Sequence, residues 1–120
     1  MWERPVPPSE IAPLEFFTRW LPEVVAGDPE RQRRLGDTLA TLQFDLIGDG
    51  GGSFLLYVEA GSVRGEAGPA SAVDLRLQLD LETWRALNAG TLSAPEALLR
   101  RRLRVEGNFA LALKLQLILG

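Results

Sequence analysis

The spacing of the apolar residues changes once in the first half of the chain, and this change constrains the fold more than any other feature of the sequence. From Leu14 to Val25 the apolar residues recur every three or four positions, which is the period of an amphipathic helix. From Leu42 to Leu46 they alternate with polar residues, which is the period of a half-buried strand. The sequence therefore predicts a helical region followed by a sheet.

Proline and glycine divide the helical region. Residues 1–8 include three prolines, which fix φ and withhold an N–H, so we expect an extended arm there and a single domain over 9–120. We expect Pro22 to kink the first helix, and Asp28, followed by a proline, suits the N-cap of a second, short helix that ends at Gly36. The predicted apolar stripe of the first helix consists of Leu14, Phe17, Leu21, Val24 and Val25.

The sheet is predicted from the same two-residue alternation. Segments 41–46 and 54–58 flank the glycine-rich stretch from Gly48 to Gly52, so they are expected to form a hairpin. A phosphate-binding loop would need a Lys and a Ser or Thr after these glycines at the start of a helix, and the sequence has a strand there instead. Further strands are predicted over 63–67, 73–80 and 103–105, the second of them with one face in water.

The C-terminal half contains three predicted helices. Asp80 can cap the first, which ends at Gly90, and Ser93 opens a capping box for the second. The leucines of the last segment, 109–119, alternate as in a strand, but Ala and Leu are strong helix formers, so we predict a helix capped by Asn108.

The chain contains no cysteine and no histidine. This composition excludes disulfides, thiol nucleophiles, His-containing catalytic triads and the usual ligand sets for zinc. Strand carboxylates such as Asp45 and Asp74 fall on the polar alternates, and the pattern forces no carboxylate pair into an apolar pocket. The formal net charge of −3 argues against nucleic-acid binding. We therefore expect no catalytic residue, no metal, no cofactor and no nucleic-acid partner.

The sequence also has no apolar stretch of the roughly 18 residues that a membrane span needs. Its first residues lack the charged and then apolar pattern of a signal peptide. We therefore expect a cytoplasmic protein.

Segment 109–119 has more apolar surface than one face of a sheet can cover. Its only polar members are Lys114 and Gln116, so a helix there must be covered on more than one side. Phe16 and Trp20, one turn apart and off the stripe of the first helix, add to this surplus. For each residue an ordinary core position is the simplest explanation. Together they indicate a tunnel between a helical layer and a sheet.

Arginine runs stand out in this acidic chain. Such runs are usually solvated faces, and the alternatives are contact with an anionic membrane, a partner protein or RNA. The candidate contact surface is Arg100, Arg101 and Arg102, with Arg104 nearby; the other run is Arg31, Arg33 and Arg34.

Several strings, in order, resemble the sterol carrier protein 2 family. They are Phe44-Asp45-Leu46 before the glycine turn, Ala72-Val73-Asp74-Leu75, Trp84 and Leu87 before Gly90, and Leu103-Arg104-Val105-Glu106-Gly107-Asn108 before the leucine-rich helix. The resemblance runs from about Leu14 to the end. It implies an α+β fold: a five-stranded mixed sheet with helices on one face and a hydrophobic tunnel between the layers for fatty acyl chains, acyl-CoA or sterols.

On this resemblance we expect a non-catalytic carrier that exchanges its lipid with membranes or enzymes. The chain ends in Leu-Ile-Leu-Gly instead of the Ser-Lys-Leu-type signal of eukaryotic members, which favours a stand-alone bacterial-type protein and makes an isoprenoid tail a further candidate cargo. The candidate lining residues are Phe16, Phe17, Trp20, Leu21, Phe44, Leu56, Leu77, Trp84, Leu87, Phe109, Leu113 and Leu117.

Other functions use the same residues. The apolar surface would also serve a protein–protein interaction module or a homodimer, and the arginine runs would serve an RNA-associated factor. Some bacterial relatives resemble accessory proteins of quinone assembly. Transient contact with an anionic membrane is a further expected interaction.

Overall fold

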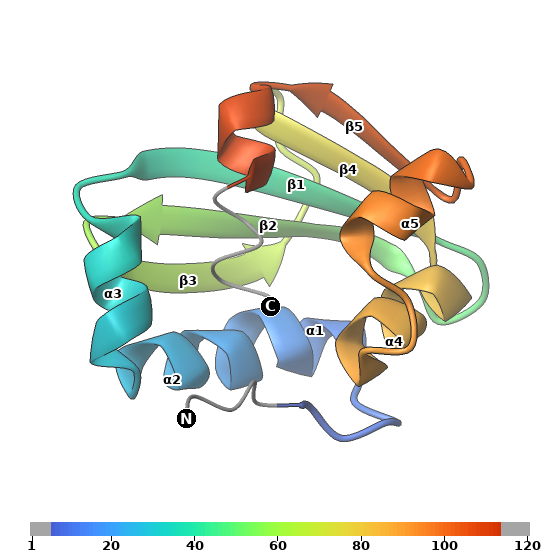
Figure 1. The fold of residues 1–120 in the computed structure, drawn as a ribbon, viewed down its shortest axis with the longest axis horizontal. Coiled ribbons are helices and arrows are strands. Elements are labelled where there is room, and N and C mark those ends of the chain that lie inside the picture. Colours follow the sequence, from blue (N-terminus) through green and yellow to red (C-terminus); the bar gives the residue numbers. More distant parts are fainter. Residues whose placement is uncertain (1–5, 114–120) are drawn as a thin grey trace.

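A single mixed sheet of five strands forms one layer of the molecule (Figure 1). The computed structural model describes residues 6–113 of the 120-residue chain. The strand order is β3-β2-β1-β4-β5, with β1 and β4 parallel and the other neighbours antiparallel. The strands are β1 (Leu39–Ile47), β2 (Gly52–Glu59), β3 (Ser62–Ala67), β4 (Leu75–Asp80) and β5 (Leu103–Gly107). The predicted α+β fold with a five-stranded mixed sheet is confirmed.

Helices form the second layer, and Figure 1 shows α1 and α2 end to end in one helical run along the sheet, with α4 near the α1 end of that run. They are α1 (Pro13–Glu15), η1 (Phe16–Trp20), α2 (Leu21–Ala26), α3 (Pro29–Leu35), α4 (Leu81–Ala89) and α5 (Ala94–Leu99). The chain is helical again over 109–113, and the side chain of Asn108 accepts a hydrogen bond from the backbone N–H of Ala110 at 2.9 Å. The predicted cap of the last helix is therefore confirmed. The rest of the predicted helix, 114–119, lies outside the described residues, as do residues 1–5 of the predicted arm.

Alternation of side chains places the apolar residues of each strand on one face. In the parallel pair β1 and β4, Leu42 faces Leu75 and Phe44 faces Leu77, and all four side chains are buried. A parallel pair needs a connection that crosses the sheet, and residues 68–74 supply it. Val73, predicted to lie within the fourth strand, belongs to this connection because β4 begins at Leu75.

The face of the sheet away from the helices is only partly in water. Gln43 and Leu55 point to this face, yet they are 2% and 3% exposed because the crossing connection covers them. The backbone N–H of Ala70 donates to the side-chain carbonyl of Gln43 at 3.1 Å. The amide of Gln43 in turn donates to Asp45 at 2.9 Å. The connection 68–74 thus covers the outer face at Gln43 and Leu55.

Asp45 is the centre of this outer network. Besides Gln43, the hydroxyl of Ser53 and the guanidinium of Arg76 each donate to its carboxylate at 2.8 Å. Partial burial alone would raise the pKa of Asp45, but the hydrogen bonds from Gln43, Ser53 and Arg76 outweigh it and hold the pKa below its ordinary value of 3.8. The ionised form therefore stabilises the fold.

We expect Asp45→Asn to lower the free energy of unfolding by about 1–2 kcal/mol at neutral pH. Because the folded pKa is the lower one, this stabilisation is present above the unfolded pKa and is lost as pH falls through the folded value. Urea unfolding of both proteins at neutral pH and at about pH 3 measures the difference. Asp49→Asn, in the exposed β1–β2 turn, is the control. A difference of equal size at both pH values would contradict this role of Asp45.

A π-helical turn changes which face of the first helix is apolar. The N–H of Leu21 donates to the carbonyl of Phe16, five residues back, so η1 holds one residue more than an α-helical turn. The prediction that Leu14 belongs to the buried stripe is wrong, because Leu14 is 50% exposed. Phe16, predicted to lie beside the stripe as part of a wider apolar surface, is 1% exposed and belongs to the core. Pro22 lies in the first turn of α2, directly after the π turn, and the predicted kink there stays a prediction.

Candidate functional site

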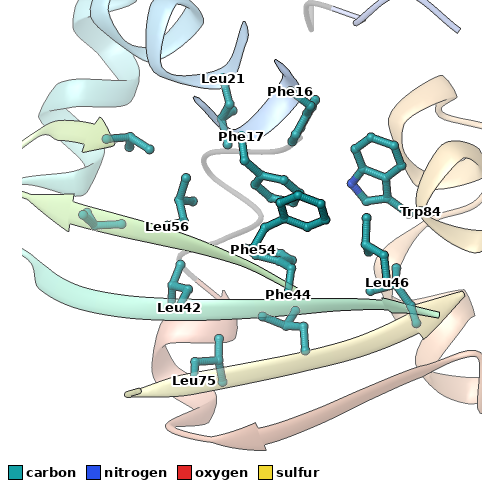
Figure 2. Close-up of a cluster of buried hydrophobic side chains, with 14 of the residues drawn as sticks. Phe16, Phe17, Leu21, Leu42, Phe44, Leu46, Phe54, Leu56, Leu75 and Trp84 are labelled. Atoms are coloured by element: carbon teal, nitrogen blue, oxygen red, sulfur yellow. The ribbon is translucent and has the colours of Figure 1, made fainter. Parts of the chain in front are cut away.

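Aromatic side chains lie between the helices and the sheet (Figure 2). Phe17 is fully buried, and its ring lies 4.8 Å from that of Phe44 and 5.3 Å from that of Phe54. Phe16 meets Phe17 edge to face at 4.9 Å and Trp84 at 5.1 Å. Residues from η1, α4, β1 and β2 therefore converge on one aromatic cluster.

The π turn places both phenylalanines in this cluster. Phe16 and Phe17 are adjacent in sequence, and the wider turn lets both rings face inward while Leu21 and Val25 remain buried below them. The backbone of η1 also lies directly on β3, because a Cβ at Gly65 would overlap the carbonyl oxygen of Phe17. Gly65 is thus the residue that lets this helix approach the sheet closely.

Most of the predicted lining residues meet in the buried core. Those in the core cluster are Phe16, Phe17, Leu21, Phe44, Leu56, Leu77 and Trp84. Trp20 and Leu87 are partly buried and pack against it. Phe109 and Leu113, on the last helical segment, are 64% and 68% exposed. Leu117 lies outside the described residues. The structure therefore brings nine of these twelve residues together, and their role as a lining stays a prediction.

Phe54 was not among the predicted lining residues, although its ring stacks on that of Phe17. The signal was present, because Phe54 shares the alternation of Leu56 on β2. Leu92, just before α5, and Ala97, within α5, also belong to the core cluster. The apolar run there is too short to show from the sequence which face of the helix is buried.

The apolar interior contains no buried carboxylate among residues 6–113. The buried polar side chains of that range are Arg31, Gln43 and Thr83. Arg31 pairs with Asp28, which caps α3. Asp80 caps α4 from the surface, where the hydrogen bond from the N–H of Thr83 is the main cause of its lowered pKa. The lowered pKa of Asp80 therefore reflects a helix cap, and that of Asp45 reflects the network on the outer face.

An open groove of about 450 Å³ lies between the end of β1 and the start of α4. Its walls include Ile47 and Leu81, but Asp80, Glu82 and Arg85 give it a charged rim. None of the predicted lining residues borders it. The predicted tunnel stays a prediction.

The arginine run after α5 divides into two kinds of side chain. Arg102 is partly buried, and its Nε donates to the hydroxyl of Thr83 at 3.0 Å. Arg100 pairs with Glu96 at 2.7 Å and stays 60% exposed, and Arg101 is exposed. The candidate contact surface thus consists of Arg100 and Arg101, while Arg102 anchors the turn to α4.

Two absences concern only the part of the chain that the structure describes. None of its helices is long and apolar enough to cross a membrane. Its acidic side chains form no group of three or more that could hold a metal ion. The cytoplasmic location stays a prediction.

Known proteins share both the sequence pattern and the fold. Over 80 residues the chain is 31% identical to hydroxysteroid dehydrogenase-like protein 2 of Rattus norvegicus, covering 66% of this chain and 15% of that protein. The chain spans only 15–20% of the length of the curated relatives that it matches.

Two solved structures illustrate the fold. The palmitated SCP2L2 from Aedes aegypti superposes with a TM-score of 0.65 at 22% identity, over 88% of this chain and 93% of that one. The sec-alkylsulfatase Pisa1 from Pseudomonas sp. superposes with a TM-score of 0.68 at 19% identity, over 92% of this chain but only 16% of the enzyme.

The family model described as the SCP-2 sterol transfer family matches residues 20–120, which include the whole sheet and every helix from α2 onward. The resemblance noted in the sequence is thereby confirmed on most of the chain. The chain belongs to the SCP-2 sterol transfer family.

Proposed function

We propose that this protein is a non-catalytic lipid carrier that holds one long acyl or isoprenoid chain between its helices and the inner face of its sheet. The observation that carries the proposal is the apolar interior, in which strand residues such as Phe44, Leu56 and Leu77 face aromatic residues of η1 and α4. Membership of the SCP-2 family supports the same reading. The palmitated relative from Aedes aegypti supports a single acyl chain as cargo.

Exchange with a membrane is energetically balanced for such a carrier. Each methylene gains about 0.8 kcal/mol on leaving water, whether it enters a bilayer or an apolar interior. A chain of about sixteen carbons therefore gains roughly 12 kcal/mol in either place. The protein can take up such a lipid and release it again, and the length of the site sets its preference.

We expect saturable binding of single-chain fatty acids of about 14–18 carbons with Kd in the micromolar range, once ordering of the chain offsets part of the burial. Titration with a fluorescent fatty acid, followed by displacement with unlabelled chains of increasing length, measures it. Octanoate is the control, because it buries too few methylenes to compete. Native mass spectrometry of the purified protein would identify a retained lipid. No saturable binding across the series would overturn the carrier proposal.

One observation favours a second function. Phe109 and Leu113 lie one helical turn apart and are both largely exposed, as expected of a contact for another protein or a second copy of this chain. The matched region is a small part of much longer relatives, which suits an interaction module. Sedimentation equilibrium across a wide concentration range tests the second copy. A dimer that forms without fatty-acid binding would favour this function over the carrier.

A further inference from the structure

Two leucines project from the end of α5. Leu99 is 86% exposed and Leu98 is 43% exposed, whereas the preceding Ala97 is fully buried. Figure 1 shows α5 and the turn after it at one end of the molecule, far across the view from α3. We define the α5 tip as residues 98–101. Among the residues that the structure describes, little covers Leu99, and Leu98 is only partly covered.

The α5 tip is held in this position by its own turn. The N–H of Arg101 donates to Leu98 at 3.1 Å and the N–H of Arg102 to Ala97 at 2.8 Å. The side chain of Arg102 then joins the turn to Thr83 of α4. These bonds prevent Leu98 and Leu99 from folding back onto the core, so the tip presents them to the solvent as a fixed surface.

The charge beside the leucines is positive. Between Leu98 and Arg104 the sequence has four arginines and no acidic residue, in a chain whose formal net charge is −3. Glu96 lies one turn before Arg100 and pairs with it at 2.7 Å, and the Arg100 side chain still remains 60% exposed. Basic residues on an acidic protein attract an anionic partner surface. Exposed leucines beside them favour a partner surface that also has an apolar layer to bury them.

Arg101 occupies a backbone conformation that favours glycine. Its φ is +59°, in the left-handed region, at the position after a helix where glycine is most common. Gly90 takes this position after α4. The α5 tip therefore carries a positive charge at a site where glycine would relieve backbone strain.

We propose that the α5 tip docks the protein on anionic lipid bilayers, with Leu98 and Leu99 entering the interface and Arg100 and Arg101 contacting lipid phosphates. This inference rests on the proposed function in one respect: docking would serve a lipid carrier by bringing its cargo site to the membrane. Docking itself needs no cargo. A bilayer combines phosphate charge with an apolar layer a few ångströms below it, and it is therefore the one occupant that satisfies both halves of the tip.

Vesicle co-sedimentation of the full chain tests the docking surface. The probes are vesicles of phosphatidylcholine alone and vesicles with about a third phosphatidylglycerol, at low and at physiological salt. We expect binding only to the anionic vesicles, weakened by salt. Removing both charges with Arg100→Gln and Arg101→Gln should lower the affinity about 20-fold, and Leu99→Ser should lower it about tenfold.

Matched controls separate the tip from general charge and general hydrophobicity. Arg33→Gln with Arg34→Gln removes two exposed arginines that also share one glutamate partner, Glu30, at the far end of the molecule. Leu39→Ser removes a leucine that is 74% exposed on β1. Both controls should change the vesicle affinity less than twofold. Equal losses in the controls and the tip variants would overturn the proposal.

Arg101→Gly separates docking from stability. Glycine suits the left-handed φ, so the Tm should stay equal or rise by a few degrees while the vesicle affinity falls about fivefold. If Arg101→Gly removed the charge and left vesicle binding intact, the α5 tip would not be the docking surface. A loss with the arginine variants but none with Leu99→Ser would identify a site for soluble polyanions such as RNA or an acidic protein. Either outcome overturns the proposed docking of the α5 tip on a bilayer.

Fatty-acid titration without vesicles keeps this inference apart from the carrier proposal. The tip variants should bind fatty acids with unchanged Kd, because none of the substituted residues belongs to the core cluster. Vesicle binding in a protein that binds no fatty acid would leave the docking surface standing and overturn the carrier. Fatty-acid binding without any vesicle binding would do the reverse.

Discussion

Leu77→Asp is expected to unfold the protein, whereas Leu113→Asp is expected to leave its stability unchanged within about 0.5 kcal/mol. Leu77 is 7% exposed on β4, where Phe44 of β1 and Val105 of β5 flank it on either side. An aspartate there loses the burial of a leucine and places an unpaired carboxylate in the apolar interior, which together cost at least about 5 kcal/mol. That loss matches the whole stability of many small domains.

The comparison with Leu113 also tests the binding site. Leu113 is 68% exposed, so the carboxylate of Leu113→Asp stays in water and the fold should survive. As a predicted lining residue it should nevertheless weaken fatty-acid binding at least tenfold. Thermal unfolding and fatty-acid titration of both variants decide the matter, with Leu77→Met as the control for the position. Unfolding of both aspartate variants would place Leu113 in the static core, and full affinity in Leu113→Asp would remove it from the lining.

Gly65→Ala is expected to lower the free energy of unfolding by about 3 kcal/mol, or the Tm by roughly 10–15 °C. The added methyl group would overlap the backbone carbonyl of Phe17, which cannot rotate away as a side chain can. The whole of η1 must therefore move off β3. Phe17 would lose its close packing against Phe44 and Phe54 in the process.

Gly27→Ala is the matched control for this substitution. Gly27 ends α2 with a negative φ of −91°, and a Cβ there would lie 3.5 Å from the nearest backbone oxygen, which is an ordinary contact. Its stability should change by less than about 1 kcal/mol. Thermal and urea unfolding of the two variants measure the difference. A Gly65→Ala protein as stable as the Gly27→Ala protein would show that η1 does not depend on close contact with β3.

The strands and helix ends could be predicted because their signals are local. The alternation at Leu42, Phe44 and Leu46 lies within one strand, and the whole row is buried as expected. The caps at Asp28, Asp80 and Ser93 act on N–H groups two or three residues away. Such contacts depend on nearby residues alone, so the sequence carries all the information they need.

The face of the first helix could not be predicted in the same way. A π turn and an α turn differ by one residue, and nothing between Leu14 and Trp20 distinguishes them. The turn also meets β3 at Gly65, which is distant in the sequence. The prediction that Leu14 is buried was therefore wrong, although the prediction of a helix was correct.

The sequence predicted which residues belong to the candidate site better than it predicted how they are arranged. The apolar surplus identified Phe16, Phe17 and Trp84, and the structure joins them in one cluster. The arginine run marked the region after α5, but only the structure separates Arg102, bound to Thr83, from the exposed pair before it. That separation follows from a contact between side chains 19 positions apart.

The sequence by itself determined most of the elements of this protein, its helix caps and the apolar faces of its strands, because each depends on periods and hydrogen bonds that span only a few residues. Only the tertiary structure decided that β1 and β4 lie parallel, that the connection after β3 covers Gln43 on the outer face, and that η1 presents both phenylalanines to the sheet. These features depend on which distant segments pack together. Ala70 and Gln43, for example, are 27 positions apart, and their hydrogen bond forms only when the sheet is complete.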